Sequence, residues 1–373
     1  MILSIILFLF ILGILVFVHE LGHFVAAKKL GVKVEEFAFG FKPKLWSIKK
    51  GETVYAINAI PIGGYCSMYG EDPTESPGKG HKDWGRSFTA KPRWARAIIL
   101  VAGVFMNFVL AWIIYTIIFT TGFDPLIPGM VSGRGVKIIE PVKIASVEKK
   151  SPADLSGLKI KDQIIAVDGV RVGSPLEVVV NIVQKEGKPA NLEIKRGDKT
   201  IKMDITPRKN PPEGSGPLGI GLSEAKIGAV WYKAPGVALL QVGSLTKMTV
   251  NVFGNFVKKL VVKQEVSKDV SGMVGVGYAT DFVRHMGVTY VLQLMAMISI
   301  SLAVMNLLPI IPLDGGHLFV IAVESVRRKK LTEGQMNWMG IFGLGFILIL
   351  VVVTTLSDIL RFGWVDKVVG LFK

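Results

Sequence analysis

Four stretches of the sequence are apolar over about 20 residues, the length at which a helix crosses a lipid bilayer. The first runs from Ile2 to Val18 and continues, beyond a short polar cluster, through Phe24 to Ala27. The others run from Ala97 to Phe119, from Met286 to about Pro309 and from Met339 to Leu356. Because 50% of the residues are hydrophobic and only 20% are charged, we predict a polytopic α-helical membrane protein with about four transmembrane helices.

The chain carries 44 lysines and arginines against 29 aspartates and glutamates, a net charge of +15. This charge alternates with apolar runs instead of forming aromatic-studded basic faces, so the lipid bilayer is the expected partner and nucleic acid is not. Short loops rich in Lys and Arg stay in the cytoplasm. Three such clusters fall on one side of the predicted spans: Lys28, Lys29 and Lys33; Lys91, Arg93 and Arg96; and Arg327, Arg328, Lys329 and Lys330. The long segment between the second and third spans is therefore predicted to lie outside.

Between about Pro141 and Leu222 the sequence changes to short alternating strands broken by turn residues. The stretch from Ser151 to Gly169 resembles the core of bacterial PDZ domains, and Gly216 to Leu222 resembles their peptide-cradling loop and strand. This resemblance implies an inserted α+β domain that binds peptide tails, although the glycine-rich turn could instead simply close the domain. The predicted strands are Val142–Val147, Gln163–Val167, Ala190–Lys195 and Thr200–Ile205, and Leu176–Gln184 has helical spacing.

A small β-sheet is predicted on the cytoplasmic side, close to the membrane, from Val32–Phe41 and Thr53–Ile60. The second of these strands breaks at Pro61-Ile-Gly-Gly and offers an edge on which an unwound substrate segment could pair. Asn58 and Gly63 are accordingly candidate substrate-binding residues, and the alternative is an ordinary hairpin. Residues 72–91 are predicted to form a mobile loop. Residues 226–285 are predicted to be an amphipathic region that lies on the membrane or packs on the helices.

His19-Glu20-Leu21-Gly22-His23 matches the pattern HExxH inside the first predicted helix. Residues four apart share a helix face, so both imidazoles can bind one Zn²⁺ ion while Glu20 acts as general base on a metal-activated water. Such polar residues are costly in a membrane helix unless they bind something. The alternative is a pair of surface histidines just beyond the bilayer. The single cysteine, Cys66, excludes an intramolecular disulfide and a Cys-rich zinc ribbon.

Two histidines leave the metal short of a third protein ligand, and the preferred candidate is Asp314 in the segment NLLPIIPLDGGH, residues 306–317. An acid at the end of an apolar run needs a cation. The prolines of this segment break the helix and free backbone groups that only a protein-lined cavity could satisfy. His317 remains possible as the ligand, and Asp314 could instead cap the helix that begins at Gly315.

HELGH, NLLPIIPLDGGH and the PDZ-like domain between them resemble the site-2 protease family of intramembrane zinc metalloproteases, in the layout of bacterial members with an extracytoplasmic PDZ domain. The resemblance implies one Zn²⁺ per chain, held by His19, His23 and Asp314, with Glu20 as catalytic base. It implies that Asn306 holds the substrate backbone. It also places Gly103 and Asn107, in GVFMN, in a family motif of the second span, and we take Asn107 as a further substrate-binding candidate. Alternatively Asn107 only hydrogen-bonds across helices.

Two features depart from the family pattern. Ser271-Gly-Met-Val-Gly stands where the family has a Gly-Pro pair, and one PDZ-like region is visible where some relatives carry two. The predicted division of the chain is span one, 1–27; β region and loop, 28–92; span two, 93–122; PDZ-like domain, 123–225; amphipathic linker region, 226–285; span three with LDGGH, 286–325; basic loop, 326–338; and span four, 339–362.

The expected function is a zinc endopeptidase of the bacterial inner membrane that cuts transmembrane segments of single-span proteins, such as anti-sigma factors or signal-peptide remnants. Cleavage is expected after a first trimming by another protease, in regulated intramembrane proteolysis. Two alternatives remain open on the sequence alone: a membrane-tethered PDZ scaffold with an inert HELGH, and a zinc hydrolase of a non-protein membrane substrate.

Overall fold

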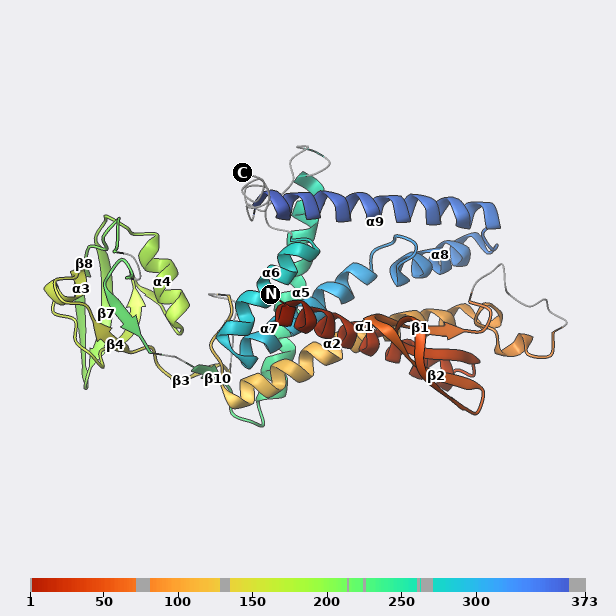
Figure 1. Cartoon of the computed structure of the whole chain (residues 1–373), viewed down its shortest axis with the longest axis horizontal. Coiled ribbons are helices and arrows are strands. Elements are labelled where there is room, and N and C mark those ends of the chain that lie inside the picture. The colour runs from red at the N-terminus through yellow and green to blue at the C-terminus, as the bar shows by residue number, and fades with distance from the viewer. Residues whose placement is uncertain are drawn as a thin grey trace. The chain divides into compact units, whose positions relative to one another are not determined.

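The computed structural model describes residues 2–71, 81–127, 135–212, 215–223, 226–259, 262 and 271–361. Within these ranges four helices are long and apolar enough to cross a membrane, and they coincide with the four apolar runs of the sequence (Figure 1). They are α1 (Ile2–Lys29), α2 (Arg93–Thr121), α7 (Val288–Asn306) and α9 (Glu333–Arg361). Each of α1, α2 and α9 extends beyond the apolar run from which it was predicted, because the flanking polar residues continue the helix.

The chain divides into two compact units, one of residues 1–111 with 242–373 and the other of residues 112–241. The first unit contains two shorter helices, α6 (Met273–Met286) and α8 (Asp314–Arg327), while α5 (Ala234–Lys258) belongs to both units. α6 packs against α1, α7 and α9. The described part of the region 226–285 thus contains the helices α5 and α6, which the prediction of a single amphipathic region did not separate.

The segment predicted as span three with LDGGH, 286–325, contains two helices, as the predicted break at its prolines implies. α7 ends at Asn306 and α8 begins at Asp314, and the connection between them contains Pro309 and Pro312. Proline lacks an amide hydrogen and restricts the residue before it, so neither helix continues through this connection. The predicted break is confirmed.

The cytoplasmic-side sheet predicted from residues 32–60 consists of two long antiparallel strands, β1 (Val34–Lys50) and β2 (Thr53–Met68). Both strands bend back on themselves, at Gly40 and at Gly63, which have φ angles of +80° and +92° that favour glycine. As a result residues 54–57 of β2 pair on one side with residues 36–39 and on the other with residues 46–49. Residues 64–67 pair with residues 36–39 alone.

This register corrects the prediction that Thr53–Ile60 offers a free edge and ends at Pro61. The strand continues to Met68, and its first half lies in the interior of the sheet. The outer segment is Gly64–Met68. Periodicity alone could not show this, because alternation of side chains identifies a strand but not its neighbours.

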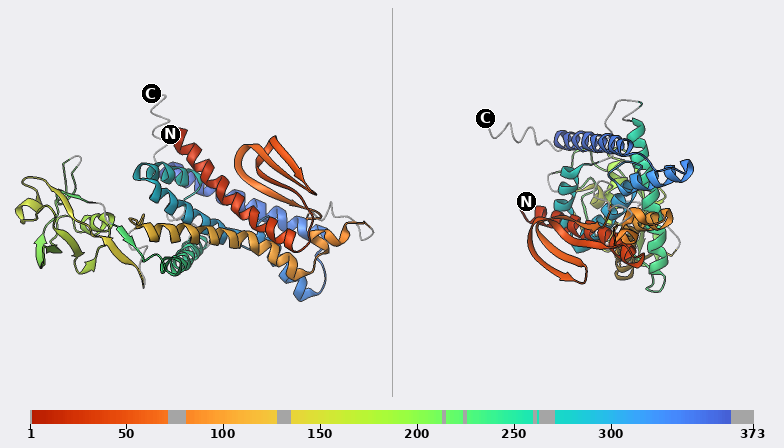
Figure 2. Two further views of the ribbon diagram at one scale, coloured as in Figure 1. Left: turned by 90° about the horizontal axis from the view of Figure 1, so that it is seen from below. Right: turned by 90° about the vertical axis from the view of Figure 1, so that its right-hand side faces the viewer.

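Aromatic side chains hold this sheet against α1, beside which β1 and β2 curl (Figure 2). Phe17 and Phe24 of α1 pack on Phe37 of β1, with ring centroids 5.3 and 4.9 Å apart, and Phe24 also packs on Tyr55 of β2. Phe17 and Phe24 flank the HELGH sequence, and Phe37 pairs with Cys66 of the outer strand segment. The aromatic contacts therefore bring the outer strand segment close to HELGH.

The loop predicted over residues 72–91 is only partly described. Residues 72–80 lie outside the described residues. Residues 81–91 contain two short 3₁₀ turns, η1 (Trp84–Arg86) and η2 (Phe88–Ala90), and Phe88 is buried in the core formed by α1, α2 and the sheet. The predicted loop is therefore locally ordered at this end.

The second unit contains the predicted inserted domain, whose strands and helix are where the sequence places them. Its four-stranded sheet has the order β6-β5-β7-β8, and two further pairs are β4-β9 and β3-β10. Val142, Ile164, Leu192 and other apolar side chains form its core. The elements are β3 (Lys137–Glu140), β4 (Ile144–Val147), α3 (Pro152–Leu155), β5 (Gln163–Val167), β6 (Val170–Arg171), α4 (Pro175–Val183), β7 (Ala190–Arg196), β8 (Lys199–Ile205), β9 (Ile220–Leu222) and β10 (Lys226–Gly228).

Candidate metal centre

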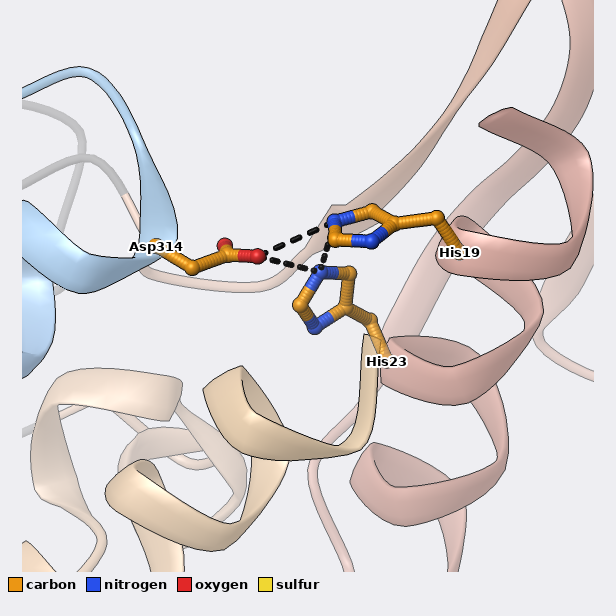
Figure 3. Close-up of side chains that lie close together, drawn as sticks. All are labelled: His19, His23 and Asp314. Carbon is orange, nitrogen blue, oxygen red and sulfur yellow. Dashed lines mark hydrogen bonds and ion pairs between the residues drawn. The ribbon is translucent and has the colours of Figure 1, made fainter. Parts of the chain in front are cut away.

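Three side chains from two helices converge on one point in the first unit. His19 and His23 lie one turn apart on α1, and Asp314 opens α8 (Figure 3). Asp314 Oδ2 lies 3.0 Å from His19 Nε2 and 3.4 Å from His23 Nε2, and the two Nε2 atoms are 3.1 Å apart. Both histidines are buried. Among the described residues this is the group of His, Cys, Asp and Glu side chains whose ligand atoms, all within 4.8 Å of one another, could hold a metal ion.

Each imidazole makes a hydrogen bond through Nδ1, on the side away from the centre. These bonds determine which ring nitrogen is unprotonated and directs its lone pair at the centre. His23 Nδ1 lies 2.9 Å from the carbonyl oxygen of Ile99, so Nδ1 carries the proton and Nε2 of the neutral ring is bare. His19 Nδ1 lies 3.4 Å from the side-chain amide of Asn107, whose Oδ1 is buried without a hydrogen-bond partner. Amide nitrogen and oxygen are assigned from such networks. Rotating the amide lets Oδ1 accept from His19 Nδ1 and leaves His19 Nε2 bare as well.

Two imidazole lone pairs and a carboxylate oxygen within this distance repel one another unless a cation lies between them. Asp314 Oδ2 is itself buried without a hydrogen-bond partner. Two nitrogens and one carboxylate oxygen, with a fourth position left over, are the donor set of a catalytic zinc site. The residues present therefore fit a zinc ion.

The structure decides between the two interpretations of Asp314 that the sequence left open. The residue at the N-cap of α8 is Leu313, and no side chain caps this helix. Asp314 is in the first helical turn and directs its carboxylate at the histidines, so the alternative that it caps the helix is wrong. His317, one turn further along α8, is not part of the described group of converging ligand atoms.

Glycines allow α1 and α2 to cross closely at this point. A methyl group on Gly22 would overlap the carbonyl of Ala102, and a methyl group on Gly103 would overlap the ring of His23. The absence of a side chain at Gly103 therefore makes the space that the His23 imidazole occupies. This gives a physical reason for Gly103, which the sequence singled out only through a family resemblance.

A cavity of about 350 Å³ opens at the centre. His19, His23 and Asp314 line it together with Glu20, Asn107 and Asn306, so the structure brings together six of the eight predicted site residues. Glu20 follows His19 on α1, and its side chain lines the same cavity as the converging ligand atoms. A carboxylate in that position can accept a proton from a water held at the centre.

Asn58 and Gly63 are not among the cavity-lining residues. The Asn58 side chain is buried and donates from Nδ2 to the carbonyl oxygen of Gly40, 2.9 Å away, so it holds the bend of β1. Among the lining residues that sequence reasoning missed, three lie on or just after β2, namely Cys66, Met68 and Glu71. The strand pattern continues through the first two, but Pro61 and the two glycines after it indicated an earlier end.

The family model for peptidase family M50 matches residues 7–350 of this chain. A protein of Clostridium perfringens whose name includes the words zinc metalloprotease is 31% identical over 337 residues, which cover 90% of this chain and 92% of that protein. The regulator of sigma-W protease RasP of Bacillus subtilis is 28% identical, over 96% of this chain and 98% of its own length. Among solved structures, the PDZ domain of the SdrC-like protein of Listeria monocytogenes is 30% identical and covers 22% of this chain and 87% of its own, with a TM-score of 0.20.

Proposed function

Since the chain belongs to peptidase family M50, the site-2 protease family, and is a zinc metalloprotease, we propose that it cuts transmembrane segments of single-span membrane proteins at the centre formed by α1 and α8. The observation that carries the proposal is the convergence of two imidazole Nε2 lone pairs and the Asp314 carboxylate on one point, within a cavity between apolar helices. His19, His23 and Asp314 hold one zinc ion per chain.

Zinc, when bound, supplies a Lewis acid that makes a water molecule acidic near neutral pH. Residues of the chain transfer the proton, hold the substrate and orient the metal ligands. Glu20 accepts the proton of the attacking water on its carboxylate and passes it to the leaving amine. Asn306, at the end of α7, holds the substrate backbone in the cavity. Asn107 orients the His19 ring through its amide, and this contact favours the cross-helix role over a substrate contact.

A helical segment must unwind before water can reach its carbonyls, because each carbonyl of a helix is already hydrogen-bonded. The outer strand segment Gly64–Met68 supports this step, since it lies at the edge of the sheet and two of its residues line the cavity. Strand addition there replaces the lost helical hydrogen bonds. In this proposal Gly64–Met68 takes the place that the sequence assigned to Thr53–Ile60.

The relatives and the charge pattern support the proposed substrate class. The sigma-W regulator among the relatives supports membrane-anchored regulators such as anti-sigma factors as substrates, with signal-peptide remnants as a second class. The three basic clusters support an orientation in which the HELGH end of α1 lies on the cytoplasmic side of a bacterial inner membrane and the inserted PDZ-like domain lies outside. That domain then selects substrates already trimmed by another protease, and peptide tails bind near Gly216–Gly221.

Three variants of the purified protein test the metal centre. Asp314→Ala should lose zinc and cleavage of a single-span substrate together, whereas Glu20→Gln should keep its zinc and lose turnover, because a neutral amide does not accept the proton. Asp198→Ala, an exposed acid in a turn of the inserted domain, should change neither. Metal analysis and mass mapping of the products measure these outcomes. Full zinc content in Asp314→Ala, cleavage by Glu20→Gln, or hydrolysis of lipid without cleavage inside the span would contradict the proposal.

A further inference from the structure

The outer strand segment Gly64–Met68 has amide groups that face away from β1. Tyr69 donates its backbone amide inward to the carbonyl of Lys33, at 2.9 Å, and successive amides of a strand point in opposite directions. The amides of Met68, Cys66 and Gly64 accordingly face outward. A partner strand would use these donors.

One of these donors is already bonded to a carboxylate. The amide of Met68 donates to Oε2 of Glu71 at 3.4 Å. The chain turns back after the strand, with Glu71 N donating to the carbonyl of Met68 at 3.1 Å, and so brings the Glu71 side chain to its own strand edge. Glu71 also lines the cavity that His19 and Asp314 line.

We propose that the Glu71 carboxylate occupies the place of a substrate carbonyl on the strand edge, and that a substrate segment binds by displacing it from the Met68 amide. Glu71 is then a specificity-determining residue of the protease. The inference rests on the proposed strand addition at Gly64–Met68. It adds that the Glu71 side chain competes with the substrate for the Met68 amide.

The consequence for specificity follows from the energy of unwinding. A segment that leaves its helix gives up internal hydrogen bonds and gains those of the strand edge. Competition by Glu71 reduces that gain and so slows a stable helix, whose cleavage is limited by unwinding and strand pairing. A segment that unwinds at low cost is limited by a different step and is slowed less. A hydrogen bond of 3.4 Å is long and weak, which suits an occupant that yields to a substrate.

Two single-span substrates that differ only in their spanning segment test the inference: one segment is uniform leucine, and the other carries an Asn-Gly pair at its centre, which loosens a helix. Glu71→Ala should raise kcat/KM for the leucine substrate about 3- to 10-fold, the range of one hydrogen bond, and act mainly through KM. The effect on the Asn-Gly substrate should be smaller. Glu71→Gln keeps the shape and a weaker acceptor, so its effect should lie between that of Glu71→Ala and the wild type.

Glu35→Ala is the matched control, because Glu35 is an exposed acid of the same sheet outside the cavity. Zinc content and binding of labelled leucine substrate to zinc-loaded Glu20→Gln protein, with and without Glu71→Ala, provide readouts apart from turnover. Tighter binding with Glu71→Ala supports the inference. An equal fall in kcat on both substrates would make Glu71 part of the chemistry, and unchanged selectivity and binding would leave it without a role; both overturn the inference. If zinc-loaded wild type cuts neither substrate, the proposed function fails instead.

Discussion

At the scale of single residues, the metal centre depends on the absence of a side chain at Gly103. A methyl group there would overlap the His23 imidazole, whose other nitrogen is held by the carbonyl of Ile99. We expect Gly103→Ala to displace the ring and to lower zinc affinity by about 100-fold, since even residues that only orient metal ligands contribute 10- to 100-fold. Zinc titration of the apoprotein measures this.

Gly345→Ala is the matched control for Gly103→Ala. Gly345 is also a glycine of a spanning helix, but a methyl group on it would meet no neighbouring atom. Zinc affinity should be unchanged in this variant. Unaltered zinc binding in Gly103→Ala would mean that α1 and α2 can move apart at no cost, contrary to the close crossing described above.

At the scale of secondary-structure elements, the two halves of β2 differ in the number of neighbouring strands, since residues 54–57 are paired on both sides and residues 64–67 on one side. Residues 54–57 have a neighbour on each side, so a proline at Ala56 removes an amide from the interior of the sheet. Ala56→Pro should therefore disturb the whole sheet and lower cleavage of a helical substrate and of an already unfolded peptide to the same degree. A loss confined to the helical substrate would restore Thr53–Ile60 as the strand on which substrates pair.

The position of α8, which carries Asp314, depends on a buried ion pair with α2. Arg96 Nη2 lies 3.2 Å from Glu324 Oε2, and the other carboxylate oxygen of Glu324 accepts from the amide of Leu331 at 3.2 Å. Removing one partner leaves a buried charge uncompensated, so Glu324→Leu should lower the free energy of unfolding by about 3 kcal/mol. The double variant Arg96→Met with Glu324→Leu should recover most of it. Thermal unfolding in detergent, followed with zinc content, distinguishes these outcomes, and equal damage in the two variants would contradict the argument.

At the scale of the whole molecule, the inserted domain is a self-contained addition to the chain. Its apolar core is built from residues 142–218, and its ends meet where Ser223 N donates to the carbonyl of Lys143 at 2.8 Å. Because the ends are adjacent, replacing residues 141–222 by a short flexible linker should leave zinc content and cleavage of trimmed substrates unchanged. If the domain selects trimmed substrates, untrimmed ones should then be cut equally well. Rejection of untrimmed substrates by the zinc-loaded deletion variant would remove the domain from that role.

Much of the fold could be predicted from the sequence because it depends on neighbours in the chain. Runs of apolar residues identified α1, α2, α7 and α9, and alternation identified the strands of the inserted domain. The four-residue spacing in HELGH places His19 and His23 on one helix face through helix geometry alone. These patterns report hydrophobicity and helix or strand geometry over a few residues, and both act locally.

The tertiary structure decided which distant groups meet. Asp314 meets the histidines, and Ile99 meets His23, because helices cross, and the outer strand segment Gly64–Met68 reaches the metal centre because β2 folds back. The sequence indicated that Asp314 needed a cation but could not exclude a helix cap, and it assigned the free edge to the wrong half of β2. Such pairings depend on how whole elements pack, and no local periodicity carries that information.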